Sequence, residues 1–364
     1  MTAKYPFYYK STIILLGLVL IVYILGHLGA VLIPLSFAAM VAILLNPLCN
    51  WLQNKKVPHM TAIILSILVA VFVFGGIGYF FFSQMSSFTS ELPLLKQRLA
   101  DLFGRLQTEL DARFGIDIEK QNQWFDEAQD KLKPIAGSAI GGIAGSLYML
   151  LLLPVYCFLI LYYKTLLLNF MYEVFAKDKT KEVAIVLTQT KMAIQSYMFG
   201  LLLEGLIVAI LNTSALLLLN VHYAILIGVM GAILNVLPYI GGLIAIAIPV
   251  LIATITKDGF QTQIWIILLY LLIQFIDNHF LIPYIVSSKV KINALISIVI
   301  VLMGGALWGI SGMFLSIPFI GLLKIVFDRI PELKPWGKLL GDEIPTKHLG
   351  QTRRAAIGAK IPEE

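Results

Sequence analysis

Charged residues and cysteines are scarce in this sequence. Asp, Glu, Lys and Arg make up 13% of its 364 residues, whereas soluble domains carry about 25%. This scarcity excludes an ordinary soluble globular protein. The two cysteines, Cys49 and Cys157, lie in apolar stretches without a metal-ligand or redox spacing. We interpret them as small buried hydrophobic residues.

Enzyme signatures are also missing. The sequence has no Gly-x-x-x-x-Gly-Lys-Ser/Thr loop for ATP and no His-Glu-x-x-His pair for zinc. The segment 309–312 falls short of the Gly-x-Ser-x-Gly nucleophile elbow. We therefore expect neither an enzyme nor a bound cofactor. The net charge of +6 does not indicate a nucleic-acid partner, because the basic residues lie in short loops beside apolar stretches.

Long apolar stretches dominate what is present, with 59% hydrophobic residues. About 20 apolar residues cross a bilayer as a helix. We expect an all-α polytopic membrane protein whose first span is retained rather than cleaved. Gly26, Gly29 and Pro34 divide the first two spans, and a re-entrant pair is the alternative there. The six predicted spans are Thr12–Ile33, Leu35–Leu52, Thr61–Ser83, Ile135–Tyr163, Ser196–Leu219 and Thr262–Val286.

Two segments are too polar to cross a membrane. Gln84–Pro134 holds nine acidic and seven basic residues with apolar positions at helical spacing, which predicts an extramembrane helical insert. Lys164–Gln195 is amphipathic and rich in lysine, which predicts a helix on the cytoplasmic membrane surface. Gly137, Gly141 and Gly145 predict a helix-packing face. The chain thus divides into segments 1–83, 84–134, 135–195, 196–328 and a cytoplasmic tail, 329–364.

Two further apolar stretches, Ala224–Thr256 and Asn293–Asp328, are each interrupted near the middle. Each has about 33 to 36 residues, more than one crossing needs and fewer than two crossings need. Polar or helix-breaking residues interrupt the first at 235–242 and the second at 304–312. Irregular backbone at membrane depth must be buried in protein or line a wet cavity. We therefore predict two re-entrant helical hairpins.

The distribution of lysines supports this topology. With both hairpins re-entrant, Lys289 and Lys291 reach the cytoplasm, as do both termini. A single crossing at each interrupted stretch would export these two lysines, against the positive-inside rule. The two units of span plus hairpin then have opposite orientations, which is the inverted-repeat plan of many transporters. A short similarity between 229–232 and 302–305 agrees with this plan.

Acidic side chains inside the predicted spans mark a candidate site. Glu204 and Asp277 lie in corresponding spans, and Gln274 and Asn278 flank Asp277. Ionisable groups in a membrane normally face partners or water, so we expect a proton or coupling ion here. The alternative for Glu204 is a structural hydrogen bond across a helix interface. His279 is more typical of packing than of a proton relay.

The hairpin tips would supply the rest of a substrate or ion site, through free amides and carbonyls. The alternative is that their glycines only allow tight helix packing. The tip residues are Asn235, Pro238, Gly241 and Gly242 in the first hairpin, and Gly304, Gly305, Gly309, Ser311 and Gly312 in the second.

The C-terminal half resembles the autoinducer-2 exporter (AI-2E) family of bacterial membrane proteins. The similar motifs occur in the family's order and spacing, and the insert between the third and fourth spans also matches, so the likeness covers nearly the whole chain. The motifs are 237–242 (LPYIGG), 276–278 (IDN), 281–283 (LIP), 285–290 (IVSSKV), the glycine-rich 302–312 and 315–318 (LSIP).

The resemblance implies a bacterial cytoplasmic-membrane protein that exports a small polar solute, coupled to protons or sodium ions, and that forms homo-oligomers. It places the family's acidic-Asn pair at Asp277 and Asn278. Three alternatives stay open: a sodium/proton antiporter, a non-transporting membrane scaffold that uses the insert to bind a partner, and a passive pore.

Overall fold

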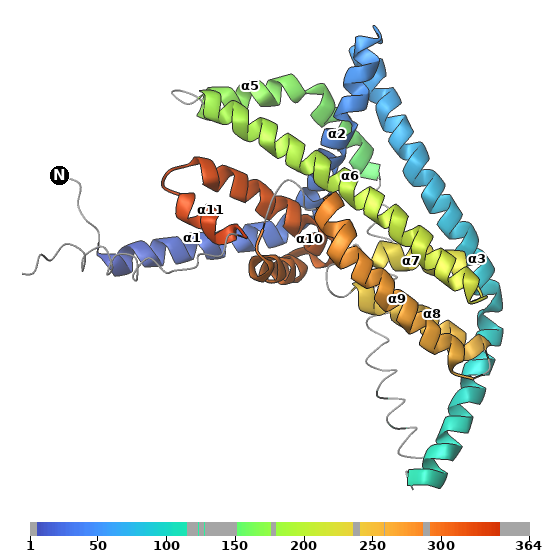
Figure 1. Ribbon diagram of the computed structural model, residues 1–364. Helices are drawn as coiled ribbons and strands as arrows, with labels where there is room; N and C mark the ends of the chain where they lie inside the picture. Colours follow the sequence, from blue (N-terminus) through green and yellow to red (C-terminus); the bar gives the residue numbers. More distant parts are fainter. Residues whose placement is uncertain are drawn as a thin grey trace, which may run out of the picture.

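The computed structural model describes residues 6–114, 123, 127, 151–175, 180–235, 241–257, 259–286 and 292–342. All secondary structure within these residues is helical, which confirms the all-α class (Figure 1). A helix at Leu151–Tyr162 precedes α5. The other elements are α1 (Phe7–His27), α2 (Gly29–Asn54), α3 (His59–Phe114), α5 (Lys164–Phe175), α6 (Thr180–Leu218), α7 (Ala224–Asn235), α8 (Gly241–Thr256), α9 (Gln261–Ile276), the π-helix η1 (Asp277–Val286), α10 (Ala294–Arg329) and α11 (Lys334–Leu340).

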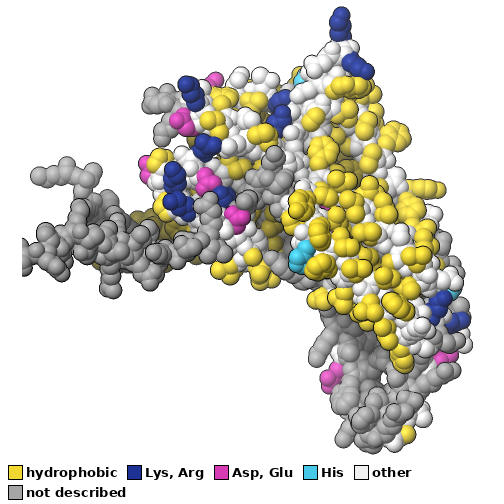
Figure 2. Space-filling model, viewed as in Figure 1, with side chains coloured by type: hydrophobic (Ala, Val, Ile, Leu, Met, Phe, Trp, Pro, Cys, Tyr) yellow, Lys and Arg dark blue, Asp and Glu magenta, His cyan; other side chains and the backbone are white. Residues whose placement is uncertain are grey.

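Five helical segments in the described part of the chain are long and apolar enough to cross a membrane. They are Gly29–Asn54, His59–Gln84, Thr180–Leu218, Gln261–Ile285 and Ala294–Arg329. The helix Leu151–Tyr162 and α5 are bent by 63° to each other. If these two helices form one span, the described part of the chain has six candidate spans. Hydrophobic side chains cover much of the surface in Figure 2, whereas Lys and Arg gather at its edges. The chain is therefore a multi-pass membrane protein.

The boundary between the first two helices lies earlier than the sequence predicts. The chain breaks at Leu28, so α1 ends at His27 and Pro34 lies inside α2. The predicted spans Thr12–Ile33 and Leu35–Leu52 are wrong at this boundary. Pro34 is buried and is the sixth residue of α2, so its missing N–H removes one hydrogen bond of the helix. Packing therefore outweighs the helix-breaking tendency of proline.

The predicted third span, Thr61–Ser83, agrees with the candidate span His59–Gln84, but the helix continues past it. The helix α3 runs without a break from the third predicted span to Phe114, well into the predicted insert. The predicted surface helix Lys164–Gln195 is also wrong as one element, since α5 ends at Phe175 and α6 begins at Thr180. The change from apolar to polar residues along α3 alters the surroundings of the helix and leaves its backbone helical.

Part of the fourth predicted span lies outside the described residues. This part includes Gly137, Gly141 and Gly145, whose predicted packing role stays a prediction. The described part, Leu151–Tyr162, packs Cys157 and Leu161 against buried residues of α2 and α3. Both cysteines are free and buried in this core, as the sequence predicts.

The helix α6 connects most of the molecule (Figure 1). It contacts α2, α5, α7, α9, η1 and α10. One apolar core joins its C-terminal end to α7, α8 and α9 through Leu216, Ile227, Ile252 and Ile266. Another core joins Met198 of α6 to Met40 of α2 and Leu315 of α10. The segment of α6 between Met198 and Leu216 is therefore packed into an apolar core at each of its ends.

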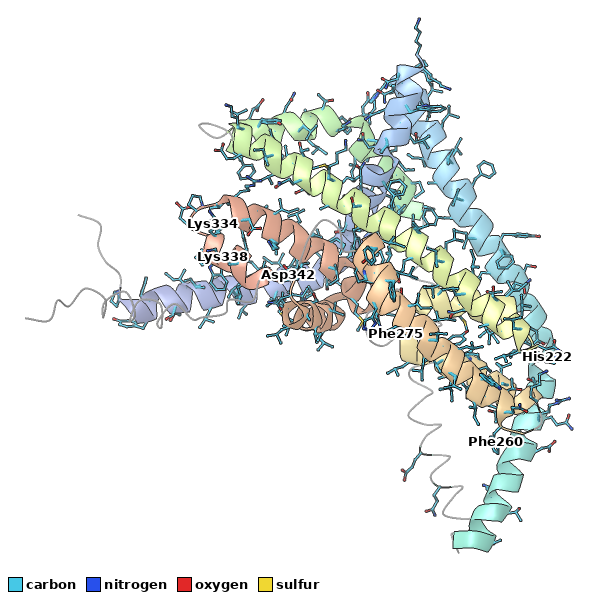
Figure 3. All side chains as sticks on the ribbon, in the orientation of Figure 1. His222, Phe260, Phe275, Lys334, Lys338 and Asp342 are labelled. Carbon is cyan, nitrogen blue, oxygen red and sulfur yellow. The ribbon has the colours of Figure 1, made fainter. Side chains whose placement is uncertain are left out.

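Helices α7 and α8 pack antiparallel. A Cβ atom built on Gly231 of α7 would lie 3.5 Å from the Cβ atom of Ala245 in α8, and one built on Gly241 would overlap the carbonyl group of Leu234. His222, before α7, and Phe260, after α8, lie at the same end of the molecule (Figure 3). The lysines Lys334 and Lys338 of α11 lie on the opposite side of it.

The helix α10 also folds back on itself. Trp308 (φ −132°, ψ 20°) and Gly309 (φ 59°, ψ −142°) leave the helical conformation, so α10 consists of two arms. A Cβ atom on Gly304 would lie 2.5 Å from the carbonyl oxygen of Gly312, and Ser316 Oγ donates to the carbonyl oxygen of Ile300, 3.0 Å away. Residues eight apart would be about 12 Å apart along a straight helix. The interruption predicted at 304–312 is therefore a reversal centred on Trp308 and Gly309.

Candidate functional site

The structure brings Glu204 and Asp277 together. Glu204 lies on α6 with 4% of its surface exposed, and Asp277 is the first residue of η1 with 1% exposed. The two carboxyl groups interact directly with each other. Both are thus removed from water and face a group of the same kind, an arrangement that charge repulsion makes costly when both are ionised.

Neutral amides supply the hydrogen bonds to Asp277. Asn235 Nδ2, at the end of α7, donates to Asp277 Oδ2 at 2.8 Å. Gln274 Nε2, one turn before Asp277, is 3.5 Å from the same oxygen and 3.4 Å from Asn278 Oδ1. The tip of the α7–α8 hairpin is therefore bonded to the carboxyl pair, so a change of charge there acts on the hairpin directly.

The backbone changes its geometry at the site. The α-helix α9 becomes the π-helix η1 at Asp277. Pro283 lies inside η1 and has no N–H to donate to a carbonyl of the previous turn. π-Helical turns are rare and are frequent at functional sites. The predicted span Thr262–Val286 matches the joint bounds Gln261–Val286, but the change of helix type was not predicted.

Two glycines allow the helices of the site to approach closely. A Cβ atom on Gly242 would lie 2.6 Å from Gln274 Oε1 and 3.7 Å from Asn235 Oδ1. Gly241 meets the carbonyl group of Leu234 at the end of α7. Both predicted glycines therefore lie beside the polar cluster. The third tip residue, Pro238, lies outside the described residues.

A small cavity opens beside Asp277. Its volume, taken as the space open to the centre of a water molecule, is about 10 Å³. This is about enough for one water molecule. Its polar lining comes from α6, α7 and α9 together with Asp277, and its apolar lining from Val208, Gly231, Ala245 and Ile273. The polar lining residues are Asn212, Asn235, Tyr270, Gln274 and Asp277.

No basic side chain neutralises the carboxyl pair within the described part of the chain. The ion pair found there, Lys324 with Asp328 at 2.6 Å, belongs to α10. The described residues also contain no group of three or more His, Cys, Asp and Glu side chains that could hold a metal ion. The arrangement therefore suits a proton or a cation held largely by neutral oxygen atoms.

The second set of predicted tip residues does not line this cavity. Gly304 and Gly312 lie at the contact between the two arms of α10, and Gly305 lies against Met313. Gly309 lies at the reversal of α10, and Ser311 lies just after it. Trp308 Nε1 donates to the carbonyl oxygen of Leu25 in α1, 2.9 Å away. The tip of α10 thus contacts the break between α1 and α2.

The α10 hairpin reaches the carboxyl pair through aromatic side chains. Phe314 on its second arm packs with Phe37 of α2 and with Tyr197 of α6, at ring distances of 5.2 and 6.4 Å. Tyr197 and Glu204 lie two turns apart on the same face of α6. The second hairpin is therefore connected to the site indirectly, through α6.

Two residues of the cavity were not predicted as site residues. Asn212 follows Glu204 by about two helical turns, and Tyr270 precedes Asp277 by about two turns. Residues at this spacing share a helix face. Their spacing from the two carboxyl groups is therefore the signal in the sequence that points to them, although it does not specify a partner on the neighbouring helix.

Comparison with known proteins gives a family match and several relatives. The sequence model of the family described as AI-2E family transporter matches residues 12–332. The AI-2 transport protein TqsA of Escherichia coli (strain K12) is 24% identical over 342 residues, which cover 91% of this chain and 95% of TqsA. YrrI of Bacillus subtilis (strain 168) is 26% identical over 311 residues, covering 81% and 85% of the two chains. YhhT of Escherichia coli (strain K12) is 24% identical over 341 residues, covering 92% and 96%.

Proposed function

Because this chain belongs to the AI-2E transporter family, we propose that it is a secondary transporter that exports a small polar solute in exchange for protons or sodium ions. The proposed coupling of solute export to an ion is supported by one observation. Glu204 and Asp277 are buried against each other, without a basic partner in the described residues. Such a pair needs a proton or a cation to offset its repulsion. Binding and release of that ion would change the charge of the site.

We propose that α7–α8 and the two arms of α10 are re-entrant hairpins in two inverted units. The antiparallel packing of α7 on α8 supports this, as does the reversal of α10 at Trp308 and Gly309. The glycines Gly231 and Gly304, which share the short sequence similarity, each pack against the opposite arm of their own hairpin. Paired discontinuous helices of this kind mark the binding sites of many secondary transporters.

The hydrogen bond between Asn235 and Asp277 suggests how coupling works. While Asp277 is ionised, its oxygen accepts from the amide at the tip of α7 at 2.8 Å and holds the hairpin closed. When a proton binds Asp277, this hydrogen bond weakens and the hairpin is released. The second hairpin, with its tip residues Gly304, Gly305, Gly309, Ser311 and Gly312, is the other moving element and responds through Phe314 and Tyr197.

The membrane, the orientation and the assembly also belong to this proposal. We place the chain in the bacterial cytoplasmic membrane with both termini in the cytoplasm, as the distribution of lysines favours. AI-2 is the first solute to test, because TqsA is named for its transport. We expect homo-oligomers, and α1, whose apolar side chains are mostly exposed, provides surface for a second copy or for lipid.

Sodium/proton antiport is the second candidate function. It is favoured by the size of the cavity, which accommodates about one water molecule, and by its lining with neutral oxygen atoms. A signalling solute would need a larger space, opened by movement of a hairpin. The two candidates share the carboxyl pair and differ in which species crosses the membrane.

Flux into vesicles that contain the purified protein tests the proposal. We expect uptake to increase when a proton or sodium gradient is imposed, which excludes a passive pore or a scaffold. Asp277→Asn keeps the shape of the side chain and removes its charge, so we expect gradient-driven flux to fall at least about tenfold, the effect of losing one charged interaction.

Asp328→Asn is the matched control. Asp328 is a carboxylate paired with Lys324 on α10, away from the cavity, and we expect its replacement to leave flux unchanged. Thermal unfolding of each variant checks that it is folded. If folded Asp277→Asn protein transports as fast under a gradient as the unaltered protein, the coupling role of Asp277 is wrong.

A further inference from the structure

We propose that the cavity beside Asp277 is a binding site for one dehydrated monovalent cation, with Asn212 and Tyr270 as ligands that join Asp277. This inference rests on the proposed function, because it names the ion that the carboxyl pair exchanges for a proton. It adds two ligands from two helices that neither the sequence motifs nor the carboxyl pair assigns.

Unpartnered oxygen atoms carry the inference. Asn212 Oδ1, Tyr270 Oη and Asp277 Oδ1 are buried and, apart from the carboxyl group of Glu204 beside Asp277, have no hydrogen-bond partner among the described residues. All three residues line the same cavity, and each is at least nine-tenths buried. A buried oxygen without a partner destabilises the protein, because it has lost its hydrogen bonds to water. Three such atoms around one space are explained by an ion that all three coordinate.

The donors decide the class of ion. Two of the three are neutral and the third is a carboxylate, a hard oxygen set without nitrogen or sulfur. Calcium is usually held by six to eight oxygens that include several carboxylates, and the described residues contain no such cluster. Magnesium retains several waters, for which a cavity of about 10 Å³ has no room. A dehydrated cation with a single positive charge fits, because it needs neither several carboxylates nor room for several waters.

The position of the site connects ion binding to the hairpin. Asn212 Nδ2 lies near Gly231 of α7, 3.3 Å from the position a Cβ atom would take there. Asn235 of the same hairpin donates to the other oxygen of Asp277. An ion in the cavity therefore contacts α6, α9 and Asp277 while the hairpin covers it. The titratable groups that line the cavity are Asp277 and Tyr270, and Glu204 on α6 lies beside Asp277.

Equilibrium binding of radioactive sodium to the purified full-length protein tests the site without transport. We expect saturable binding that lithium displaces and that calcium does not. Tyr270→Phe removes one oxygen and keeps the ring, while Asn212→Leu removes the amide at similar volume. Each is expected to weaken sodium binding at least about tenfold, as expected for loss of one buried ligand.

Gln263→Leu is the matched control, because Gln263 on α9 is also buried with an unpartnered oxygen but does not line the cavity. We expect its sodium affinity to equal that of the unaltered protein. The proposal is overturned by the absence of saturable binding, by calcium competing as well as lithium, or by folded Tyr270→Phe protein that binds sodium normally. Gradient-driven flux without sodium binding would overturn this site and leave the proposed transport function standing. Sodium binding without gradient-driven flux would overturn the proposed transport function and leave the ion site standing.

Discussion

At the scale of single residues, the site depends on a few polar groups in apolar surroundings. The sequence identifies Glu204 and Asp277 because carboxylates are costly inside a membrane, and the structure brings the two together. Asn235, Gly241, Gly242 and Gln274 also lie at this cluster. Asn212 and Tyr270 were not assigned to it, because a single polar group in an apolar helix is compatible with many partners until the neighbouring helix is known.

Gly309 gives a prediction at this scale. Its backbone, at φ 59° and ψ −142°, lies in a region that residues with a side chain avoid. We expect Gly309→Ala to lower the free energy of unfolding by about 1–3 kcal/mol. Thermal or denaturant unfolding of the protein in detergent measures this change.

Gly76→Ala is the control for this prediction. Gly76 lies in the helix α3, and a Cβ atom there would meet nothing within 4 Å. An added methyl group in an open helical position is expected to leave stability unchanged or raise it by up to about 1 kcal/mol. Equal stability of Gly309→Ala and Gly76→Ala would mean that the reversal of α10 does not need glycine.

At the scale of elements, breaks in the helices were predicted better than their continuations. The interruption after Asn235 and the reversal within 304–312 follow from glycine and proline, which act on the backbone locally. The continuation of α3 to Phe114 was not predicted, because charged residues change where a helix lies without ending it. The boundary at Leu28 was missed for the opposite reason, since packing of the buried Pro34 overrides a local preference.

The contact between the α10 tip and α1 gives a prediction at the element scale. Trp308 Nε1 donates to the carbonyl oxygen of Leu25, close to Leu28 at the boundary between α1 and α2. Trp308→Phe removes this donor, and we expect a loss of about 0.5–1.5 kcal/mol in stability. Faster amide hydrogen exchange at the tip of α10 should accompany it.

Trp265→Phe serves as the comparison, because Trp265 lies on α9 with about half of its surface exposed, at 49%. We expect a change of no more than about 0.5 kcal/mol there. Gly29→Ala is a second way to disturb the contact, since a Cβ atom on Gly29 would lie 3.2 Å from the Trp308 ring. If neither Trp308→Phe nor Gly29→Ala changes exchange at the tip, the contact does not hold the hairpin.

At the scale of the whole molecule, composition and long apolar stretches were enough to predict a polytopic helical membrane protein. The roles of the two hairpins in one shared site were less predictable. The structure connects the α7–α8 hairpin to Asp277 directly and the α10 hairpin through Phe314 and Tyr197. Such long-range contacts depend on how α6 packs against both sides, and no local pattern in the sequence specifies that packing.

The re-entrant hairpin requires α7 and α8 to enter and leave the membrane on one side. Single cysteines at His222, Lys257 and Lys289 measure this directly, in a chain whose buried Cys49 and Cys157 are replaced by alanine. A membrane-impermeant thiol reagent is applied to intact cells and again after permeabilisation. We predict that positions 222 and 257 react in intact cells and that position 289 reacts only after permeabilisation. Positions 222 and 257 on opposite faces, or 257 and 289 on the same face, would contradict the re-entrant hairpin and the transport mechanism built on it.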